Sequence, residues 1–541
     1  MRPPARPRAG KKRSPKRAPV FWMVASLFVL SSIIHLPVRA ATLPNSGTGQ
    51  DFFQSHPVWS VEIELSAQAI ARLKEESRTY VPAVVRICGE ELRGAGVHLK
   101  GRGSFQSIQE KPSWTVDFGR FSKGQTLHGF EKIHLNNSVE DPSYLKDQIA
   151  TELFRAANIP VPRVAHAQVR LNDRELGFYV VKEGFTQGFL ARHFHRADGN
   201  LYEPAENRDI DQPMKRHLGR AMGKDQPELK RLASAALEPD LKERWKHLRE
   251  LLDVDRFVDF LAIEIIAGQW DGYGLGKNNF RVYHDPGSGK IVFLPSGMDQ
   301  AFAKPDMSWK PQMTGLMARS ILALPEGRQL YEKRFRELFG RLLVSERLSN
   351  RVEEIVAQLR PSLTRQQFQS VGREARELCR KIGQREKSLK QQLSEPELAA
   401  LNFRGDVALL SGWKPSDGSM PERTPQIFES KAVLRISAMG KAAGSWRTAF
   451  RLGQGRYEFV GNAKVVGVSS LTFGKHHGAS LRMFGKPGRS AELIGASSWQ
   501  TLRTEFEVAL PEEVVVAICE LRAAAGEVYF DKESLQVVRK E

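Results

Sequence analysis

The chain has 541 residues, a formal net charge of +19 and a hydrophobic fraction of 41%. A chain of this length exceeds one compact core, so two or three domains are expected. Its three cysteines, Cys88, Cys379 and Cys519, are far apart and lack metal-ligand spacing, which argues against a disulfide framework and against a zinc site. No nucleic-acid-binding motif accompanies the basic charge, so nucleic acid is not an expected partner.

The first 40 residues read as a targeting segment. They hold nine basic residues and no acidic ones, so the rest of the chain carries a charge of +10. A basic arm precedes the apolar run Val20 to Ile34, and Val38-Arg39-Ala40 follows it, which is the pattern of a secretory signal cleaved after Ala40. We therefore expect export to the periplasm, the cell surface or the medium. An uncleaved N-terminal anchor is the alternative and would be the expected membrane contact, although a spanning helix needs about 20 apolar residues.

The next part of the chain predicts a polar linker at residues 41–56 and then an α+β domain. Strand patterns occur at 58–63, 81–87, 96–99, 113–118, 165–171 and 177–181. Asp141-Pro142-Ser143 opens a helix that ends at Asn158. Residues 205–250 are charged and helical and are expected to form a surface insertion, whereas residues 256–270 are almost continuously apolar and predict a buried helix.

Residues 277–299 form the most informative local unit. Two strand patterns flank Asp285-Pro286-Gly287-Ser288-Gly289, which is a strong hairpin signal. A hairpin centred near Gly287 brings Asn278 and Asn279 close to Asp299, and Asp271 leads from the buried helix into the same corner. Two carboxylates and an amide oxygen are hard-oxygen ligands that suit Mg²⁺ and the phosphate oxygens it bridges.

Several motifs together resemble the CotH kinase family, the spore coat protein H-like atypical protein kinases. They are Gly-Gln-Trp-Asp271-Gly-Tyr, the pair Asn278-Asn279, residues 294–300, residues 100–104 followed by Lys111, and residues 176–183. The resemblance covers residues 57–310, with a looser helical extension at 311–400. It implies a bilobal, kinase-like fold that phosphorylates protein Ser or Thr with ATP and Mg²⁺ or Mn²⁺.

The resemblance also implies roles for individual residues around the hairpin. Asp271 resembles the catalytic carboxylate that accepts the proton of the substrate hydroxyl. Asn279, or less favourably Asn278, resembles the amide that holds the metal, and Asp299 resembles the metal-binding carboxylate. Each has a structural alternative: the asparagines suit left-handed turns, and Asp299 suits a turn after the strand.

Further residues would contact ATP. Lys111 looks like the phosphate-binding lysine, braced by Glu152 on the following helix. Residues 101–104, which include Arg102 and Ser104, would close over the phosphates through backbone N–H groups, and the stretch around Glu183 resembles the hinge that binds adenine. The alternative for Lys111 is a solvated lysine at a strand end. The alternative for Arg102-Gly103 is an ordinary hairpin turn, and the alternative for Glu152 is a charge on the helix surface.

Two departures from the family pattern keep a non-catalytic protein open as the alternative function. Many members carry an acidic residue two positions before the metal-binding Asp, where this chain has Gly297. The segment from Asp271 to Asn279 is also longer than in ordinary kinases, in which only four residues separate the Asp from the Asn. A pseudokinase-like surface or adhesion protein that binds protein or glycan ligands would fit both departures.

The last part of the chain, residues 401–541, predicts an all-β domain. Eight short strands with glycine turns indicate an antiparallel, jelly-roll-like sandwich. It looks like modules of exported carbohydrate-active proteins, so a glycan is a candidate partner. Trp413, Trp446 and Trp499 are either sugar-stacking platforms or, more simply, core residues.

Overall fold

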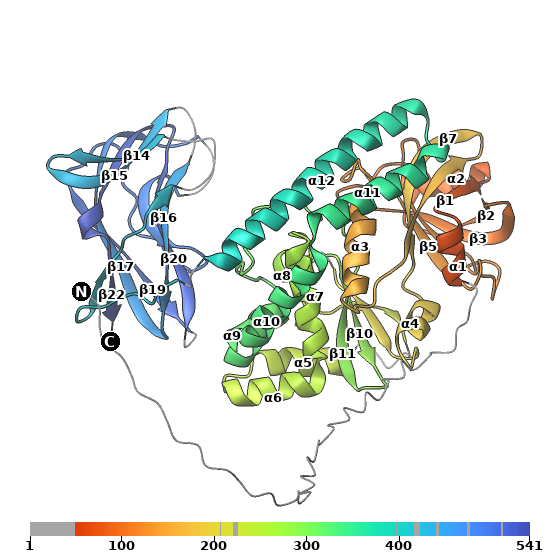
Figure 1. Cartoon of the computed structure of the whole chain (residues 1–541), viewed down its shortest axis with the longest axis horizontal. Coiled ribbons are helices and arrows are strands. Elements are labelled where there is room, and N and C mark those ends of the chain that lie inside the picture. Colours follow the sequence, from red (N-terminus) through yellow and green to blue (C-terminus); the bar gives the residue numbers. More distant parts are fainter. Residues whose placement is uncertain are drawn as a thin grey trace, which may run out of the picture. The chain divides into compact units, whose positions relative to one another are not determined.

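The computed structural model describes residues 49–540 except 206, 220–224, 396–397, 416–421, 440–442, 473–475 and 510–511 (Figure 1). The expected signal segment and the first half of the expected linker, residues 41–48, lie outside these residues. Within the described ranges, none of the helices combines the length and the apolar composition that crossing a membrane requires.

Seven strands form a closed barrel in the first part of the fold. They are β1 (Val58–Glu64), β2 (Val81–Ile87), β3 (Glu90–Lys100), β4 (Ser113–Asp117), β5 (Lys132–Asn136), β6 (Val164–Leu171) and β7 (Arg174–Glu183). Their order is β1-β2-β3-β4-β5-β7-β6, and the parallel pair β1–β6 closes the barrel. The interior holds large side chains such as Trp59, Trp114 and Tyr179, each fully buried. The strands follow the alternating pattern of the sequence, whereas the closure joins residues more than 100 positions apart.

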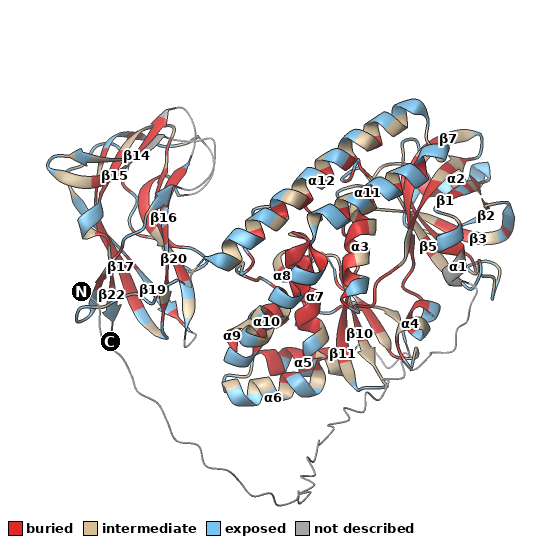
Figure 2. Cartoon of the chain, in the orientation of Figure 1, coloured by how far each residue is buried: buried red, intermediate tan, exposed pale blue. Residues whose placement is uncertain are grey.

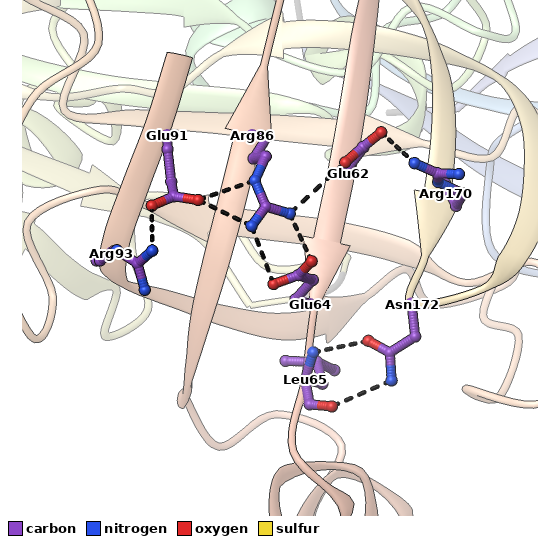
Figure 3. A network of polar contacts seen from close by, with 8 residues as sticks. All are labelled: Glu62, Glu64, Leu65, Arg86, Glu91, Arg93, Arg170 and Asn172. Carbon is purple, nitrogen blue, oxygen red and sulfur yellow. Dashed lines mark hydrogen bonds and ion pairs between the residues drawn. The ribbon is translucent and has the colours of Figure 1, made fainter. Parts of the chain in front are cut away.

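Polar contacts on the outer face of the barrel connect β1 and β6, the two strands that close it (Figure 3). Arg170 on β6 pairs with Glu62 on β1. The side chain of Asn172 accepts from the backbone N–H of Leu65 at 2.8 Å and donates to its carbonyl oxygen at 3.1 Å. These contacts hold the parallel pair, which has no hairpin turn to set its register.

Part of the expected linker is structured. Helix α1 (Gly49–Ser55) lies within residues 41–56, and its Phe52 and Phe53 are buried. The ring of Phe53 lies 4.9 Å from that of Trp59 and 5.0 Å from that of Phe130. The prediction of a polar linker is therefore wrong for these residues, because two aromatic side chains dock on the barrel.

A larger lobe follows the barrel and is built around helix α7 (Val254–Ile266), which is buried along nearly its whole length (Figure 2). A sheet of order β11-β10-β8-β9 packs with it. The remaining elements of this lobe are α4 (Gln187–His193), β8 (Asn200–Glu203), β9 (Lys215–Leu218), α5 (Pro227–Ala236), α6 (Leu241–Leu251), α8 (Tyr273–Gly276), β10 (Phe280–Asp285), β11 (Lys290–Pro295), α9 (Leu316–Ala323) and α10 (Pro325–Leu342). Helix α3 (Lys146–Ala156), which precedes β6, shares the core of this lobe.

The charged segment 205–250 is more than a surface insertion. Leu229 and Leu232 of α5 are buried in the core of the lobe, together with Ile210 and Met214. Buried Asp209 accepts from the hydroxyl of Tyr273 at 3.0 Å, so this segment also braces the loop that carries the candidate catalytic residue.

Two long helices end this lobe, α11 (Ser345–Leu359) and α12 (Arg365–Ser394). Thr364 begins α12 with a capping box that includes Gln367. The buried side of α12 repeats at helical spacing, and its members are Val371, Ala375, Leu378, Ile382, Arg385 and Leu389. An arginine therefore occupies a position that the pattern assigns to an apolar residue.

The C-terminal strands form the expected sandwich. One sheet has the order β12-β22-β17-β21-β15-β14, with β19 paired to β17, and the other has the order β13-β16-β20-β18. The strands are β12 (Val407–Leu409), β13 (Lys414–Pro415), β14 (Glu422–Phe428), β15 (Lys431–Met439), β16 (Gly444–Leu452), β17 (Gly455–Ser469), β18 (Gly478–Met483), β19 (Gln500–Val508), β20 (Glu513–Arg522), β21 (Ala525–Asp531) and β22 (Gln536–Lys540). Strand β17 is longer than the short strands that the sequence predicts, because it runs without interruption through Gly461.

Candidate active site

The hairpin β10–β11 has the register that its symmetry predicts. Phe280 pairs with Pro295 and Asp285 with Lys290. The N–H of Ser296 donates to the carbonyl oxygen of Asn279 at 2.8 Å. The structure therefore brings the asparagine pair beside the segment that leads to Asp299, as expected.

Asp271 is held by both asparagines. The side-chain amide of Asn279 donates to Oδ2 of Asp271 at 2.7 Å and to its backbone oxygen at 3.0 Å. The amide of Asn278 lies 3.2 and 3.3 Å from the two carboxylate oxygens. The backbone of Asn279 is also in the left-handed region, with φ of 52°, so this residue both forms the turn and holds the carboxylate of Asp271. This leaves its amide oxygen directed away from Asp271.

Gly297 has no room for a side chain. A Cβ atom built there would lie 2.3 Å from Oδ1 of Asn279. An acidic residue at this position would therefore displace the amide that fixes Asp271. The glycine complements Asn279 sterically, which gives its departure from the family pattern a structural reason.

Asp299 lies at the buried end of the hairpin. Burial, and secondarily the Asp147 carboxylate, raises the pKa of Asp299 to about 7, although nearby Lys182 acts in the opposite direction. Its backbone oxygen accepts from Nζ of Lys146 at 2.9 Å. The N–H of the preceding Met298 donates to Oδ1 of Asp147 at 3.0 Å. The first turn of α3 thus holds the backbone on which Asp299 is carried.

A buried lysine–carboxylate pair joins the barrel to this corner. Nζ of Lys182 on β7 lies 2.5 Å from Oδ1 of Asp147 and 2.5 Å from the carbonyl oxygen of Ser296. Lys100, at the end of β3, donates to Oδ1 of Asn136 at 2.6 Å. Burial, with a further contribution from the charge of Lys182, lowers the pKa of Lys100 to about 8. Two ammonium groups therefore face the corner from the barrel.

Sequence reasoning missed Lys100 and Lys182 as site residues, although both lie inside the recognised motifs. The signal was present for Lys182. It follows the apolar run Phe178 to Val181, in a strand whose residues from Phe178 to Glu183 are all buried, and a buried lysine requires a partner.

Lys111 and Glu152 do not form the expected brace. Nζ of Lys111 donates to the hydroxyl of Tyr144 at 2.9 Å and lies 5.0 Å from the ring centre of Tyr179. Burial lowers the pKa of Lys111 to about 8. Glu152 instead accepts from Arg351 on α11 at 3.0 Å. That prediction is wrong because α3 presents Glu152 to another helix and presents Asp147, in its first turn, to the barrel.

The glycine-rich loop after β3 lies close to the corner. Gly101 has φ of 103°, which favours glycine, and its carbonyl oxygen accepts from Arg78. The carbonyl oxygen of Ser104 accepts from Asn137 at 3.2 Å. A Cβ atom on Gly103 would lie 3.3 Å from Oε1 of Glu140, whose other oxygen accepts from Gln300.

Arg102 lies near a second charged pair. Its positive charge contributes, after burial, to lowering the pKa of Arg281, which donates to Glu203 at 2.8 Å. Arg102 therefore lies within electrostatic range of Arg281 in the larger lobe. Glu140 lies between Gly103 and Gln300, the residue that follows Asp299.

Glu183 ends β7 and is saturated by two guanidinium groups. Arg163 donates to it at 3.0 Å and Arg192 at 2.5 Å. Burial alone would raise the pKa of Glu183, but these arginines outweigh it and hold the pKa low. The N–H groups of Glu183 and Gly184 donate to the carbonyl oxygens of Arg163 and Lys132 at 3.0 and 2.9 Å. These two N–H groups are therefore already engaged at the expected hinge.

Glu264 binds the backbone of the loop that follows Asp271. Its two oxygens accept from the N–H groups of Tyr273 at 2.8 Å and Gly274 at 2.9 Å. Burial raises the pKa of Glu264 to about 8. A Cβ atom on Gly272 would lie 2.3 Å from Oε1 of Glu264, so the loop fits closely over the carboxylate. Glu264 is one of two acids, with Asp259, in the apolar run 256–270, and a buried acid in such a run was the available signal for this positioning residue.

Arg385 of α12 binds the backbone on both sides of the corner, before Asp271 and after Asp299. It is fully buried and donates to the carbonyl oxygens of Ile265 at 2.6 Å and Ile266 at 3.3 Å, which end α7 before Asp271. It also donates to the carbonyl oxygens of Pro305 and Met307, which follow Asp299. Helix α12 thus helps to position the corner.

The donor set suits a phosphate-bridging cation. Within the described ranges, no group of three or more His, Cys, Asp or Glu side chains is arranged to hold a metal ion. Mg²⁺ does not require such a group, because it binds through one or two carboxylates, waters and substrate phosphates. Asp299 and the amide oxygen of Asn279 fit this requirement, and Lys100 and Lys182 can offset phosphate charge.

Among the three tryptophans expected as platforms or core residues, Trp446 is buried in the core of the sandwich. Trp413 packs against that core, with its ring 6.3 Å from Phe459. Trp499 is half-buried. Its indole N–H donates to Glu429 at 2.8 Å, and the ammonium of Lys431 lies 5.4 Å from the ring centre.

Comparison with known proteins identifies one matching family model and several similar proteins. The family model described as CotH kinase protein matches residues 99–393, more than half of the chain. The chain is 22% identical over 344 residues to the inner spore coat protein H of Bacillus subtilis, covering 58% of this chain and 91% of that protein. It is 23% identical over 305 residues to the invasin CotH3 of Rhizopus delemar, but this covers only 50% of this chain and 49% of the invasin.

Solved structures that match about a quarter of this chain include carbohydrate-binding modules. TmCBM61 in complex with beta-1,4-galactotriose matches with a TM-score of 0.19 and 14% identity, covering 24% of this chain and 91% of the module. A family 30 carbohydrate-binding module matches with a TM-score of 0.16 and 10% identity, covering 26% of this chain and 98% of the module. The C-terminal β region resembles such modules in fold.

Proposed function

The chain belongs to the CotH kinase family, an atypical kinase family, and from that premise we propose that it transfers the γ-phosphoryl group of ATP to Ser or Thr hydroxyls of a protein. One observation carries the proposal. Asp271, fixed by Asn279, and Asp299, faced by Lys182, converge at the end of one hairpin.

The residues divide the work of an in-line transfer. The Asp271 carboxylate orients the attacking hydroxyl and accepts its proton, and its bonds to Asn278 and Asn279 keep it in one orientation. Lys100 and Lys182 stabilise the negative charge of the phosphates. The glycine-rich loop 101–104 covers the phosphates with backbone N–H groups. Phosphoryl transfer depends on this positioning and electrostatic stabilisation more than on covalent chemistry.

Asp299, with the amide oxygen of Asn279, would hold Mg²⁺ or Mn²⁺, which supplies charge neutralisation between the phosphates when bound. Lys182 opposes the rise in the pKa of Asp299 and so favours its ionised form. The lysine pairs with Asp147, and this pair sets the distance between the barrel and the segment 296–299. A variant at this pair should therefore affect phosphate binding before it affects proton transfer.

We place the activity outside the cytoplasm, with a substrate protein in the envelope or the medium. The support is the basic arm and short apolar run before Ala41. N-terminal sequencing of the exported protein should begin at or near Ala41, and an intact N-terminus in a membrane fraction would replace export by anchoring.

The test of phosphoryl transfer is a titration of ATP with Mg²⁺ or Mn²⁺, beside a phosphorylation assay, on the wild type and three variants. Asp299→Ala should lose metal-dependent nucleotide binding together with activity. Asp271→Ala should keep nucleotide affinity and lose about 10²-fold or more in rate. Asp173→Ala removes an exposed turn carboxylate and should change neither.

Absence of nucleotide binding by the wild type with either metal would refute the kinase proposal in favour of a non-catalytic protein. Wild-type behaviour of both site variants would make the corner structural.

For the β-sandwich we propose a glycan ligand. Trp446 is buried in the core, whereas Trp413 and Trp499 are both partly exposed, and Trp413 packs against the core. Binding of the full chain to polysaccharides, measured by affinity electrophoresis, tests this proposal separately from ATP binding.

A further inference from the structure

Lys277 lies in the loop between Asp271 and Asn279 and holds a backbone conformation that lysine rarely adopts. Its φ is 51° and its ψ is 38°, in the left-handed region, where a Cβ atom is crowded by the backbone. Glycine, which has no Cβ, is the residue that such a position after a helix usually carries. A lysine here therefore costs stability that a glycine would not, and a strained residue beside an active site suggests a function.

The neighbours of Lys277 place it beside the catalytic carboxylate. A Cβ atom on Gly276 would lie 3.1 Å from both Cα and Oδ1 of Asp271, and the side-chain amide of Asn278 lies 3.2 Å from Oδ2 of Asp271. The residues on both sides of Lys277 thus lie against Asp271. Lys277 itself is half-buried, and its ammonium group makes neither a hydrogen bond nor an ion pair within the described residues.

A second ammonium group lies at the residue that precedes Asp271. Trp270 is half-buried, and Nζ of Lys304 lies 4.7 Å from the centre of its ring. The N–H of Phe302 donates to the carbonyl oxygen of Ala267 at 2.7 Å, so the segment that carries Lys304 runs beside the turn before Asp271. Lys304 is exposed and, in the described part of the chain, is not in an ion pair.

Two acids close to these lysines in the chain leave the ammonium groups available. Asp306, two residues after Lys304, is exposed and is not in an ion pair with it. Glu264 accepts from the N–H groups of Tyr273 and Gly274, and burial raises its pKa to about 8, so it is largely uncharged at neutral pH. The charges of both lysines can therefore act on a ligand that reaches Asp271.

We propose that Lys277 and Lys304 select protein substrates in which acidic residues flank the Ser or Thr that is phosphorylated. The inference rests on the proposed kinase function and adds the class of substrate. The acceptor hydroxyl must reach Asp271, so the residues next to it pass close to Trp270 and to the loop that carries Lys277.

The lengths of the groups fit this arrangement. In an extended peptide, the residues two positions before and after the acceptor lie about 7 Å from it and on the same side of the chain. A lysine side chain is long and flexible, and its ammonium group pairs with a carboxylate as a point charge, without a fixed geometry. The same two ammonium groups disfavour basic flanks, because like charges that face each other across a contact cost affinity.

The test compares the phosphorylation of three peptides by the full chain, with ATP and Mg²⁺ or Mn²⁺. Each peptide carries one Ser, and the two residues on either side of it are all Glu, all Gln or all Lys. We expect kcat/KM to be about tenfold higher for the Glu peptide than for the Gln peptide, because exposed ion pairs are individually weak and two act together. The Lys peptide should have the lowest value, and added salt should reduce the differences.

Two variants and a control assign this preference to the two lysines. Lys277→Gly and Lys304→Gln should each lower the ratio of the Glu-peptide to the Gln-peptide kcat/KM by about threefold, and the double variant should bring it close to one. Glycine fits the left-handed backbone, so Lys277→Gly should unfold at the same temperature as the wild type or at a higher one. Lys290→Gln is the matched control. It removes a half-buried lysine at the opposite end of the hairpin β10–β11 and should leave the ratio unchanged.

Results of two kinds would overturn the inference. Equal kcat/KM for the Glu and Gln peptides, or the highest value for the Lys peptide, would remove the role of acidic flanks and leave the proposed kinase function intact. Phosphorylation of none of the peptides by a chain that binds ATP would refute the inference together with the proposed protein kinase function.

The variants can also contradict it. An unchanged ratio in the double variant would place the selection elsewhere, and an equal loss in Lys290→Gln would show a general effect of net charge. A fall in ATP affinity that matches the loss of rate in Lys277→Gly would assign Lys277 to the nucleotide phosphates. A lower unfolding temperature of Lys277→Gly would make the lysine structural.

Discussion

Replacing Gly297 by alanine tests whether the contact between this glycine and Asn279 orders the catalytic corner. The φ angle of Gly297 lies outside the left-handed region, so an alanine backbone is permitted and the effect should be steric. The new Cβ would lie 2.3 Å from Oδ1 of Asn279, and ordinary contact begins near 3.4 Å, so the amide must move by roughly 1 Å.

That displacement breaks the two bonds from Asn279 to Asp271, at 2.7 and 3.0 Å. One bond to a charged group contributes about 1.5–3 kcal/mol and one to a neutral oxygen about 0.5–1.5 kcal/mol. A displacement of this size at a positioning group lowers rates by about 10²-fold. We therefore expect Gly297→Ala to lose about 10²-fold in kcat, and Gly297→Asp at least as much, despite restoring the acidic residue of the family pattern.

The assay is kcat and KM for phosphorylation, with ATP affinity measured separately. Gly340→Ala is the control, because a Cβ there meets nothing within 4 Å and the helix should gain about 1 kcal/mol. In a double-mutant cycle, Gly297→Ala should cost little more once Asn279 is already alanine, because the clash is then absent. Full activity of Gly297→Asp, or additive losses in the cycle, would refute the steric argument.

Three further changes probe the supports of the corner. Glu264→Gln replaces one acceptor of the N–H groups of Tyr273 and Gly274 with a donor, so kcat should fall while ATP affinity stays, as rate and binding measurements would show. Arg385→Met strips four backbone carbonyls of their buried donor, so thermal unfolding should shift downward by the equivalent of about 2–4 kcal/mol, and Arg385→Lys should recover part of it. Lys111 has its pKa lowered to about 8 from 10.5, so between these values the unfolded chain binds the proton that the folded chain has lost. The unfolding free energy of the wild type relative to Lys111→Met should therefore rise across that pH range by at most about 3 kcal/mol, and denaturant unfolding that shows no such rise would contradict the burial argument.

The local sequence determined much of this protein. The alternating patterns place most strands of the barrel and the sandwich, because side chains of a strand face opposite sides in turn. The turn at Asp285-Pro286-Gly287-Ser288-Gly289 sets the register of the hairpin, and with it the meeting of Asn278 and Asn279 with the segment before Asp299. These features follow from neighbours in the chain, so they could be predicted.

Only the tertiary structure decided which distant groups meet. Asp147 rather than Glu152 contacts the buried lysine, and that lysine is Lys182 rather than Lys111. Which residue of α3 faces the barrel lysine depends on the rotation of this helix about its axis. A helical sequence pattern predicts that rotation only to within a residue or two. The same holds for Arg385, whose position in an apolar stripe is visible in the sequence, whereas its four carbonyl partners come from segments about 80 to 120 residues away. A buried charged side chain needs partners, and the fold brings these partners from distant segments of the chain. The local sequence pattern therefore does not identify them.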